Sequence, residues 1–118
     1  MLIVYGSLVS PFVRKVLATA AEKGIEVDNR PGGFAQGGDA FAEASPFGKI
    51  PAMRDPGAGA DGADFTLYDS TAIVAYLDAK HPAPRLIPED PRACGQAIAF
   101  EEFADTILMA AGGKMFFN

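Results

Sequence analysis

The first eighty residues alternate between the hydrophobic spacing of strands and that of helices. Residues 2–5 form a continuous apolar run that Gly6 ends, which is typical of a strand buried on both faces. After Pro11, the apolar positions follow the spacing of a helix with one buried face: Val13, Val16, Leu17, Ala20 and Ala21. Ser10 is a favourable N-cap and Gly24 a favourable C-terminal stop, so the pattern predicts a strand followed by a helix.

The next segments extend this unit into a small sheet. Residues 25–28 alternate like a strand, and a short helix is expected over 39–44. Residues 50–54 and 64–67 predict two strands joined by a turn rich in Gly and Pro, and residues 71–79 predict a helix. Strand–helix–strand implies a parallel pair, and the turn implies an antiparallel one. We therefore expect an α/β domain with the order βαβ-α-ββα and a mixed four-stranded sheet.

The chain after residue 80 changes character. We expect one domain over residues 1–80, a proline-rich linker over 81–91 and the start of a helical domain, apparently truncated, over 92–118. Large apolar residues keep helical spacing in this last part: Phe100, Phe103, Ile107, Leu108 and Phe116. Such an apolar face is typically buried against another surface. We therefore expect a homodimer or tighter association through this helix, together with the side of the helix over 71–79.

Composition narrows the classes of function. The 118 residues have 49% hydrophobic content, enough for a core, and a net charge of −5 without a basic run. This charge argues against nucleic acid or an anionic membrane as partner. The single Cys94 cannot form an internal disulfide, no signal-like segment opens the chain and no apolar stretch could span a bilayer, so a cytoplasmic location is expected.

Ser10 is the first candidate for chemistry. As the N-cap of a helix that Pro11 begins, it has a purely structural explanation. It also falls where the first strand meets the first helix, at the carboxyl edge of a parallel pair, where ligands tend to bind. A hydroxyl there can donate to an anion with the support of the helix dipole, although no histidine is placed to make it a nucleophile.

Two later stretches have the same two interpretations. Ile50 and Pro51 could simply begin a strand, or a cis peptide bond before Pro51 could leave the backbone of Ile50 free to pair with an extended peptide. Asp69 and Ser70 could simply cap a helix. Alternatively, Ser70 and the neighbouring N–H groups would bind a carboxylate, while Asp69 would bind an ammonium group.

Taken in order, these stretches resemble the glutathione-binding half of the cytosolic glutathione transferase superfamily, in a serine-type, bacterial-like form. They read Ser-Pro-Phe-Val-Arg-Lys from Ser10, Phe-Gly-Lys-Ile-Pro from Phe47 and Asp-Ser from Asp69. The resemblance covers residues 1 to about 80, and the remainder resembles the start of that family's helical domain. It implies a thioredoxin-like fold.

The resemblance also implies roles for individual residues. Ser10 would stabilise the glutathione thiolate, Ile50 and Pro51 would form the cis-proline clamp on the cysteinyl unit, and Asp69 with Ser70 would bind the γ-glutamyl end.

Three further residues have weaker parallels. Phe12 would lie in the glutathione site, and Lys49 would contact the glycyl carboxylate, although a solvated loop charge explains Lys49 slightly better. Asp105 could reach the γ-glutamyl ammonium across a dimer interface, but a solvated helix face is the favoured interpretation.

The expected function is a detoxifying transferase in which glutathione, as co-substrate and without a metal, attacks a small, apolar electrophile. No cysteine stands at position 10 or 12, which argues against thiol–disulfide exchange. Two alternatives stay open: a non-catalytic binding or assembly module of thioredoxin fold, and a glutathione-dependent isomerase or dehalogenase.

Overall fold

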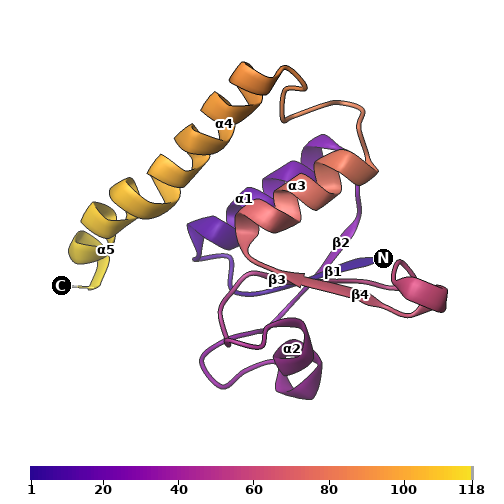
Figure 1. The fold of residues 1–118 in the computed structure, drawn as a ribbon. Coiled ribbons are helices and arrows are strands. Elements are labelled where there is room, and N and C mark those ends of the chain that lie inside the picture. The colour runs from indigo at the N-terminus through magenta and orange to yellow at the C-terminus, as the bar shows by residue number, and fades with distance from the viewer. Residues whose placement is uncertain (118) are drawn as a thin grey trace. The chain divides into compact units, whose positions relative to one another are not determined.

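The computed structural model describes the backbone of residues 1–117 and the side chains of residues 1–114. Contacts divide the chain into two compact units, Met1–Pro84 and Arg85–Asn118. The first unit holds the sheet and three α-helices (Figure 1), in the order β1 (Leu2–Tyr5), α1 (Pro11–Glu22), β2 (Val27–Arg30), α2 (Gly38–Ala44), β3 (Ala52–Asp55), β4 (Phe65–Tyr68) and α3 (Ser70–Lys80).

The sheet is mixed, with the strand order β2-β1-β3-β4. Strand β1 pairs with β2 in parallel and with β3 antiparallel, and β3 pairs antiparallel with β4. Helices α1 and α3 lie side by side on one face, and α2 covers the other (Figure 1). This arrangement confirms the predicted α/β fold class and the order βαβ-α-ββα.

Alternation along β1 supplies a core on both faces of the sheet. Ile3 and Tyr5 point to the same side as Phe41 of α2, and the rings of Tyr5 and Phe41 meet edge to face at 5.8 Å. Leu2 and Val4 point to the opposite side, which α1 and α3 cover. Burial on both faces explains why β1 is apolar at all four positions.

Two strands begin later than the sequence predicted. Strand β2 begins at Val27 instead of Ile25, because the N–H of Ile25 bonds to the carbonyl of Ala20 and completes the end of α1. Strand β3 begins at Ala52 instead of Ile50, since Pro51 has no N–H to donate to a neighbouring strand.

The turn between β3 and β4 also takes one residue that was assigned to a strand. Asp64 was expected to begin the strand, but its carboxylate accepts the N–H of Gly57 at 3.2 Å and bonds Arg54 at 3.2 Å. Asp64 therefore closes the turn, and β4 begins at Phe65.

The second unit is helical but interrupted. Asp90 caps α4 (Pro91–Phe103), a π-helical turn follows over Ala104–Leu108, and α5 covers Met109–Phe117. The hydrophobic spacing had predicted one regular helix; the π turn is found where the hydroxyl of Thr106 donates to the carbonyl of Glu102 at 2.6 Å and competes with the backbone for it. Within residues 1–117, no helix is long and apolar enough to cross a bilayer.

Candidate functional site

The strand register brings the three predicted stretches to one edge of the sheet, namely the side at which β1 and β4 end and β3 begins. Tyr5, at the end of β1, pairs with Ala52 at the start of β3, and Ala52 pairs with Tyr68 at the end of β4. Ser10 follows β1 within one turn, Pro51 precedes Ala52 directly, and Asp69 follows Tyr68 directly. Segments that are distant in sequence therefore meet at the edge where α1 and α3 begin.

Ser10 is the N-cap of α1 and is half-buried. Its Oγ accepts the N–H of Val13 at 3.3 Å, and its own N–H bonds to the carbonyl of Ser7 at 3.1 Å. One turn into the helix, the guanidinium of Arg14 donates to the carbonyl of Leu8 at 2.6 Å. The loop before Ser10 is thus tied to its own helix, which holds the backbone of Ser10 in place.

The peptide bond between Ile50 and Pro51 is cis. The side chain of Ile50 packs so closely on the turn after β1 that a Cβ on Gly6 would lie 3.0 Å from the Ile50 Cβ and 2.6 Å from the Val13 Cγ2. No backbone hydrogen bond joins Ile50 to another residue in the described part of the chain. Its N–H and C=O are therefore available for an added extended segment. Gly6 was identified from the sequence only as the end of a strand; its close packing depends on Ile50, which is distant in sequence.

Asp69 and Ser70 begin α3. Asp69 has a φ of 77°, and its Oδ2 accepts the N–H of Ala72 at 3.0 Å, so the residue caps the helix. The side chain of Asp69 is exposed, whereas Ser70 is only 5% exposed. The helix N-terminus beside them presents N–H groups and the positive end of the helix dipole.

The weaker candidates have different environments. Phe12 is half-buried in the first turn of α1, and Lys49 is exposed. The carbonyl of Lys49 accepts the hydroxyl of Ser45 at 2.6 Å, so the loop is held while the ammonium group faces solvent. Asp105 lies in the second unit, where it is half-buried and has an interaction of its own, in contrast to the solvated face that was favoured.

One hydrogen bond at this edge was not predicted from the sequence. Lys15, one turn after Ser10, donates to the Oγ1 of Thr71 at 3.3 Å. Both residues are half-buried and belong to the starts of α1 and α3. The sequence contains no sign of this pairing, because the two residues are 56 positions apart.

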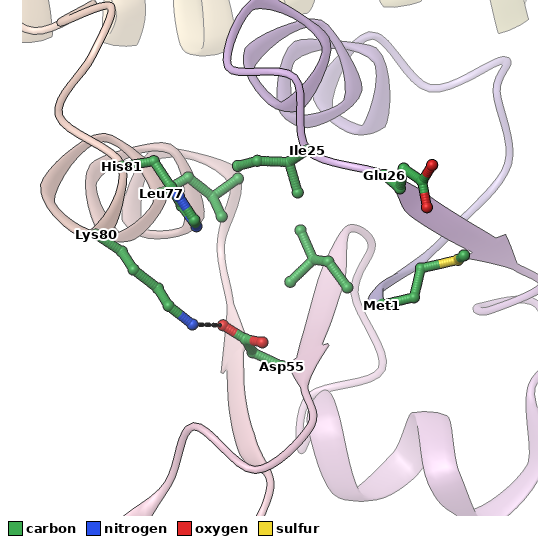
Figure 2. A pocket seen from close by; sticks show the side chains of 8 residues that line it. Met1, Ile25, Glu26, Asp55, Leu77, Lys80 and His81 are labelled. Carbon is green, nitrogen blue, oxygen red and sulfur yellow. Dashed lines mark hydrogen bonds and ion pairs between the residues drawn. The ribbon is translucent and has the colours of Figure 1, made fainter.

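A hollow of about 370 Å³ lies at the opposite edge of the sheet. It is lined by the beginning of β1, the segment before β2 and the ends of β3 and α3, and Figure 2 shows Leu77 and Ile25 beside it. Lys80 reaches across to Asp55, with Nζ and Oδ2 2.6 Å apart (Figure 2). None of the residues singled out as candidates from the sequence lines this hollow.

Electrostatics at this second edge are governed by Asp55. Burial opposes ionisation of this carboxyl, but hydrogen bonds from Lys80 and Tyr76, each 2.6 Å long, outweigh burial and hold the pKa of Asp55 below its usual range. Burial and the bond to Asp55 raise the pKa of Tyr76. Asp55 and Lys80 thus form an ion pair to which the neutral hydroxyl of Tyr76 adds a hydrogen bond.

Over the described residues, no group of three or more His, Cys, Asp or Glu side chains is placed to hold an ion.

Comparison with known proteins connects this fold to one family. The family described as "Glutathione S-transferase, N-terminal domain" matches residues 4–85. The uncharacterised GST-like protein YibF of Escherichia coli K12 is 34% identical over 107 residues, which cover 89% of this chain and 49% of that protein.

Solved structures agree with this match. A glutathione S-transferase from Methylobacillus flagellatus KT with glutathione bound superposes with a TM-score of 0.76 at 38% identity, covering 94% of this chain and 52% of that one. A theta-class enzyme from Xanthomonas axonopodis pv. citri, also with glutathione bound, gives 0.72 at 30% identity over 89% of this chain and 48% of that one.

The chain thus spans about half the length of these relatives. The family match covers more than half of the chain and includes all of the predicted site stretches. The chain belongs to the cytosolic glutathione S-transferase superfamily, whose N-terminal domain it contains.

Proposed function

We propose that the chain binds glutathione at the edge formed by Ser10, Ile50 and Asp69, and that Ser10 stabilises the bound thiolate for attack on an electrophile. The observation that supports this most strongly is the strand register, which aligns the three stretches at the beginnings of two helices. Similarity to glutathione-bound relatives adds support.

Capping and thiolate binding are compatible functions of one serine. The bond from the Val13 N–H uses a lone pair of the Ser10 Oγ, so the hydroxyl proton stays available to a thiolate. The hydroxyl also stands at the positive end of α1, where negative charge is favoured. The sulfur of glutathione would therefore receive a hydrogen bond and a favourable dipole from the same helix end.

The free energies of one hydrogen bond and one helix N-terminus are large enough to lower the pKa of the glutathione thiol. Lowering a thiol pKa by about 2 units from about 8.5 requires about 2.7 kcal/mol. A hydrogen bond to a charged group contributes about 1.5–3 kcal/mol and a helix N-terminus about 0.3–1 kcal/mol. Ser10 with its helix can thus supply the stabilisation without acting as a nucleophile.

The rest of the peptide has matching partners along the same edge. The backbone of Ile50 would pair with the cysteinyl unit as an added strand. Asp69 uses Oδ2 for the cap, which leaves Oδ1 for the α-ammonium of the γ-glutamyl end. The α-carboxylate would bind the first N–H groups of α3, and Lys49 would approach the glycyl carboxylate. Phe12 would contribute to the wall of the site.

Substitution of Ser10 tests the proposal. In Ser10→Ala, the apparent pKa of the bound glutathione thiol should rise by about 1–2 units, because the hydrogen bond to sulfur is lost. Ser10→Thr keeps both the hydroxyl and the cap and should restore the lower value. The pKa is measured by thiolate absorbance of the complex, and conjugation of a generic electrophile is followed in parallel.

Two results would count against the proposal. An unchanged thiol pKa in Ser10→Ala would remove the role of the serine. A wild-type chain that is not retained on immobilised glutathione would remove glutathione binding altogether. Loss of the cap alone costs about 1 kcal/mol of helix stability, so thermal unfolding of each variant separates this effect from the effect on the thiol.

A binding or assembly module is the second candidate. It is favoured by the exposed apolar side chains of the second unit, where Phe100 is 76% and Ile107 61% exposed. Such a face is typical of an interaction surface. Retention on glutathione without turnover would favour this candidate, and turnover by isomerisation or dehalogenation instead of conjugation would change the class of transferase.

We also propose that this face forms a homodimer. Leu108 is 53% exposed and Phe103 40%, so these two side chains are open to contact together with those of Phe100 and Ile107. The side chain of Phe116, which was assigned to the same surface, lies outside the described residues.

A further inference from the structure

We propose that Lys15 is a positioning residue that sets where the γ-glutamyl end of glutathione binds relative to the thiol. The inference rests on the proposed function, because it concerns the geometry of that site. It begins from an observation independent of any ligand: Lys15 in the first half of α1 and Lys23 at its C-cap bond to residues near the two ends of α3.

Lys23, at the C-cap of α1, holds the far end. Its ammonium lies 2.8 Å from the carboxylate of Asp78, and the two side chains are 0% and 3% exposed. The same Nζ donates to the carbonyl of His81, and to that of Pro84 at 2.7 Å. The end of α3 and the backbone after it are therefore fixed against α1 by a buried ion pair.

Lys15 makes the corresponding bond at the ligand edge. Its Nζ donates to the Oγ1 of Thr71 at 3.3 Å. Lys15 and Lys23 are eight residues apart on α1, and their partners Thr71 and Asp78 are seven apart on α3. The pairs are joined in the same order, so the helices run parallel, and a slide of α3 along α1 would strain both connections.

The consequence for the site follows from the neighbours of these residues. Thr71 comes directly after Asp69 and Ser70, and Lys15 is one turn after Ser10. The bond thus joins the helix start that would hold the γ-glutamyl end to the helix start that would hold the thiol. Fixing their separation lowers the cost of ordering the site when a peptide spans both.

A double-mutant cycle tests this role in the whole chain. Lys15→Met removes the donor, and Thr71→Val removes the acceptor while keeping the ammonium group. Each should weaken glutathione binding about three- to tenfold, and the double variant should lose less than the two single effects combined, because either single change already removes their shared bond. Titration calorimetry measures the affinities, and thermal unfolding verifies that each variant is folded.

Two further measurements distinguish a positioning role of Lys15 from a nonspecific structural effect of its substitution. The apparent pKa of the bound thiol should not change in Lys15→Met, because Ser10 is untouched, and Lys15→Arg should recover part of the affinity. Lys80→Met is the matched control, since Lys80 bonds Asp55 at the opposite edge of the sheet and should leave the affinity unchanged.

The outcomes distinguish this role from the proposed function. If wild type binds glutathione and Lys15→Met binds it equally well, the positioning role is overturned and the proposed function stands. If Lys15→Met weakens binding while Thr71→Val does not, the bond between Lys15 and Thr71 does not set the affinity and the positioning role is again wrong. If wild type does not bind glutathione, the proposed function fails and this role fails with it.

Discussion

Asp55 is a residue whose surroundings alter its chemistry. Its Oδ2 accepts bonds from the hydroxyl of Tyr76 and the ammonium of Lys80, both at 2.6 Å. Burial disfavours the carboxylate, but the two donors favour it more strongly, and the pKa of Asp55 falls below its usual value. The bonds join the end of β3 to the end of α3, so ionisation of this carboxyl is coupled to folding.

We predict an acid-dependent loss of stability that Asp55→Asn reduces. Because the folded-state pKa of Asp55 is lowered, its contribution to folding is fully present above the unfolded value of about 3.9 and is lost as the pH falls through the folded value. Urea unfolding followed between neutral and acidic pH measures it. A pH slope in Asp55→Asn identical to that of wild type below about pH 4 would contradict the assignment.

The candidate site depends on the turn that connects β1 to α1. Gly6 ends the strand with a φ of +135°, and it lies against the side chains of Val13 and Ile50. A side chain at this position would meet both the first helix and the segment before β3. The absence of a Cβ at Gly6 is therefore what allows two parts of the candidate site to approach each other.

Gly6→Ala should both destabilise the fold and weaken glutathione binding. Its Cβ would lie 2.6 Å from Val13 Cγ2, and overpacking together with the unfavourable φ should cost about 2–5 kcal/mol. Gly24→Ala is the control, since Gly24 has a φ of +68° and nothing within 4 Å of a built Cβ, so only the backbone cost of about 1–2 kcal/mol applies. Chemical denaturation compares them; equal losses would show that the contact with Val13 and Ile50 has no effect.

Across the whole molecule, fully buried large apolar side chains are found in the first unit, which also exposes some, such as Phe34 and Phe47. Every large apolar side chain that is fully buried among the described residues belongs to the first unit: Tyr5, Met53, Ile73, Leu77, Val4, Val13 and Val16. In the second unit, Phe100, Phe103, Ile107 and Leu108 are exposed instead. This difference is the basis for expecting self-association.

Sedimentation should detect a dimer or larger species whose stability depends on the second unit. The double substitution Phe100→Ser and Ile107→Ser should shift the chain towards monomer, because it removes two of the exposed apolar side chains. Phe34→Ser is the control, since Phe34 is 92% exposed in the first unit and lies outside the proposed interface. A wild-type monomer, or an equal effect of the two changes, would contradict the proposed interface.

Local sequence was sufficient for the elements of the first unit and for the candidate stretches. Hydrophobic periodicity, Ser10 before Pro11 and Asp69 before α3 act within a few residues, and such short-range signals can be interpreted without knowing the fold. The residues at which helices and strands begin and end were less predictable from the sequence. The start of β2 depends on where the N–H of Ile25 finds its acceptor, and the π turn in the second unit lies where the hydroxyl of Thr106 bonds the carbonyl of Glu102.

The sequence by itself therefore determined which residues can cap, clamp or bind, since those capacities belong to the residue types and their neighbours. Only the tertiary structure decided that Ser10, Ile50 and Asp69 share one edge, that Gly6 must lack a side chain, and that Lys15 bonds Thr71. The physical reason is that strand register and helix packing join groups up to 61 residues apart, and no local pattern encodes such a pairing.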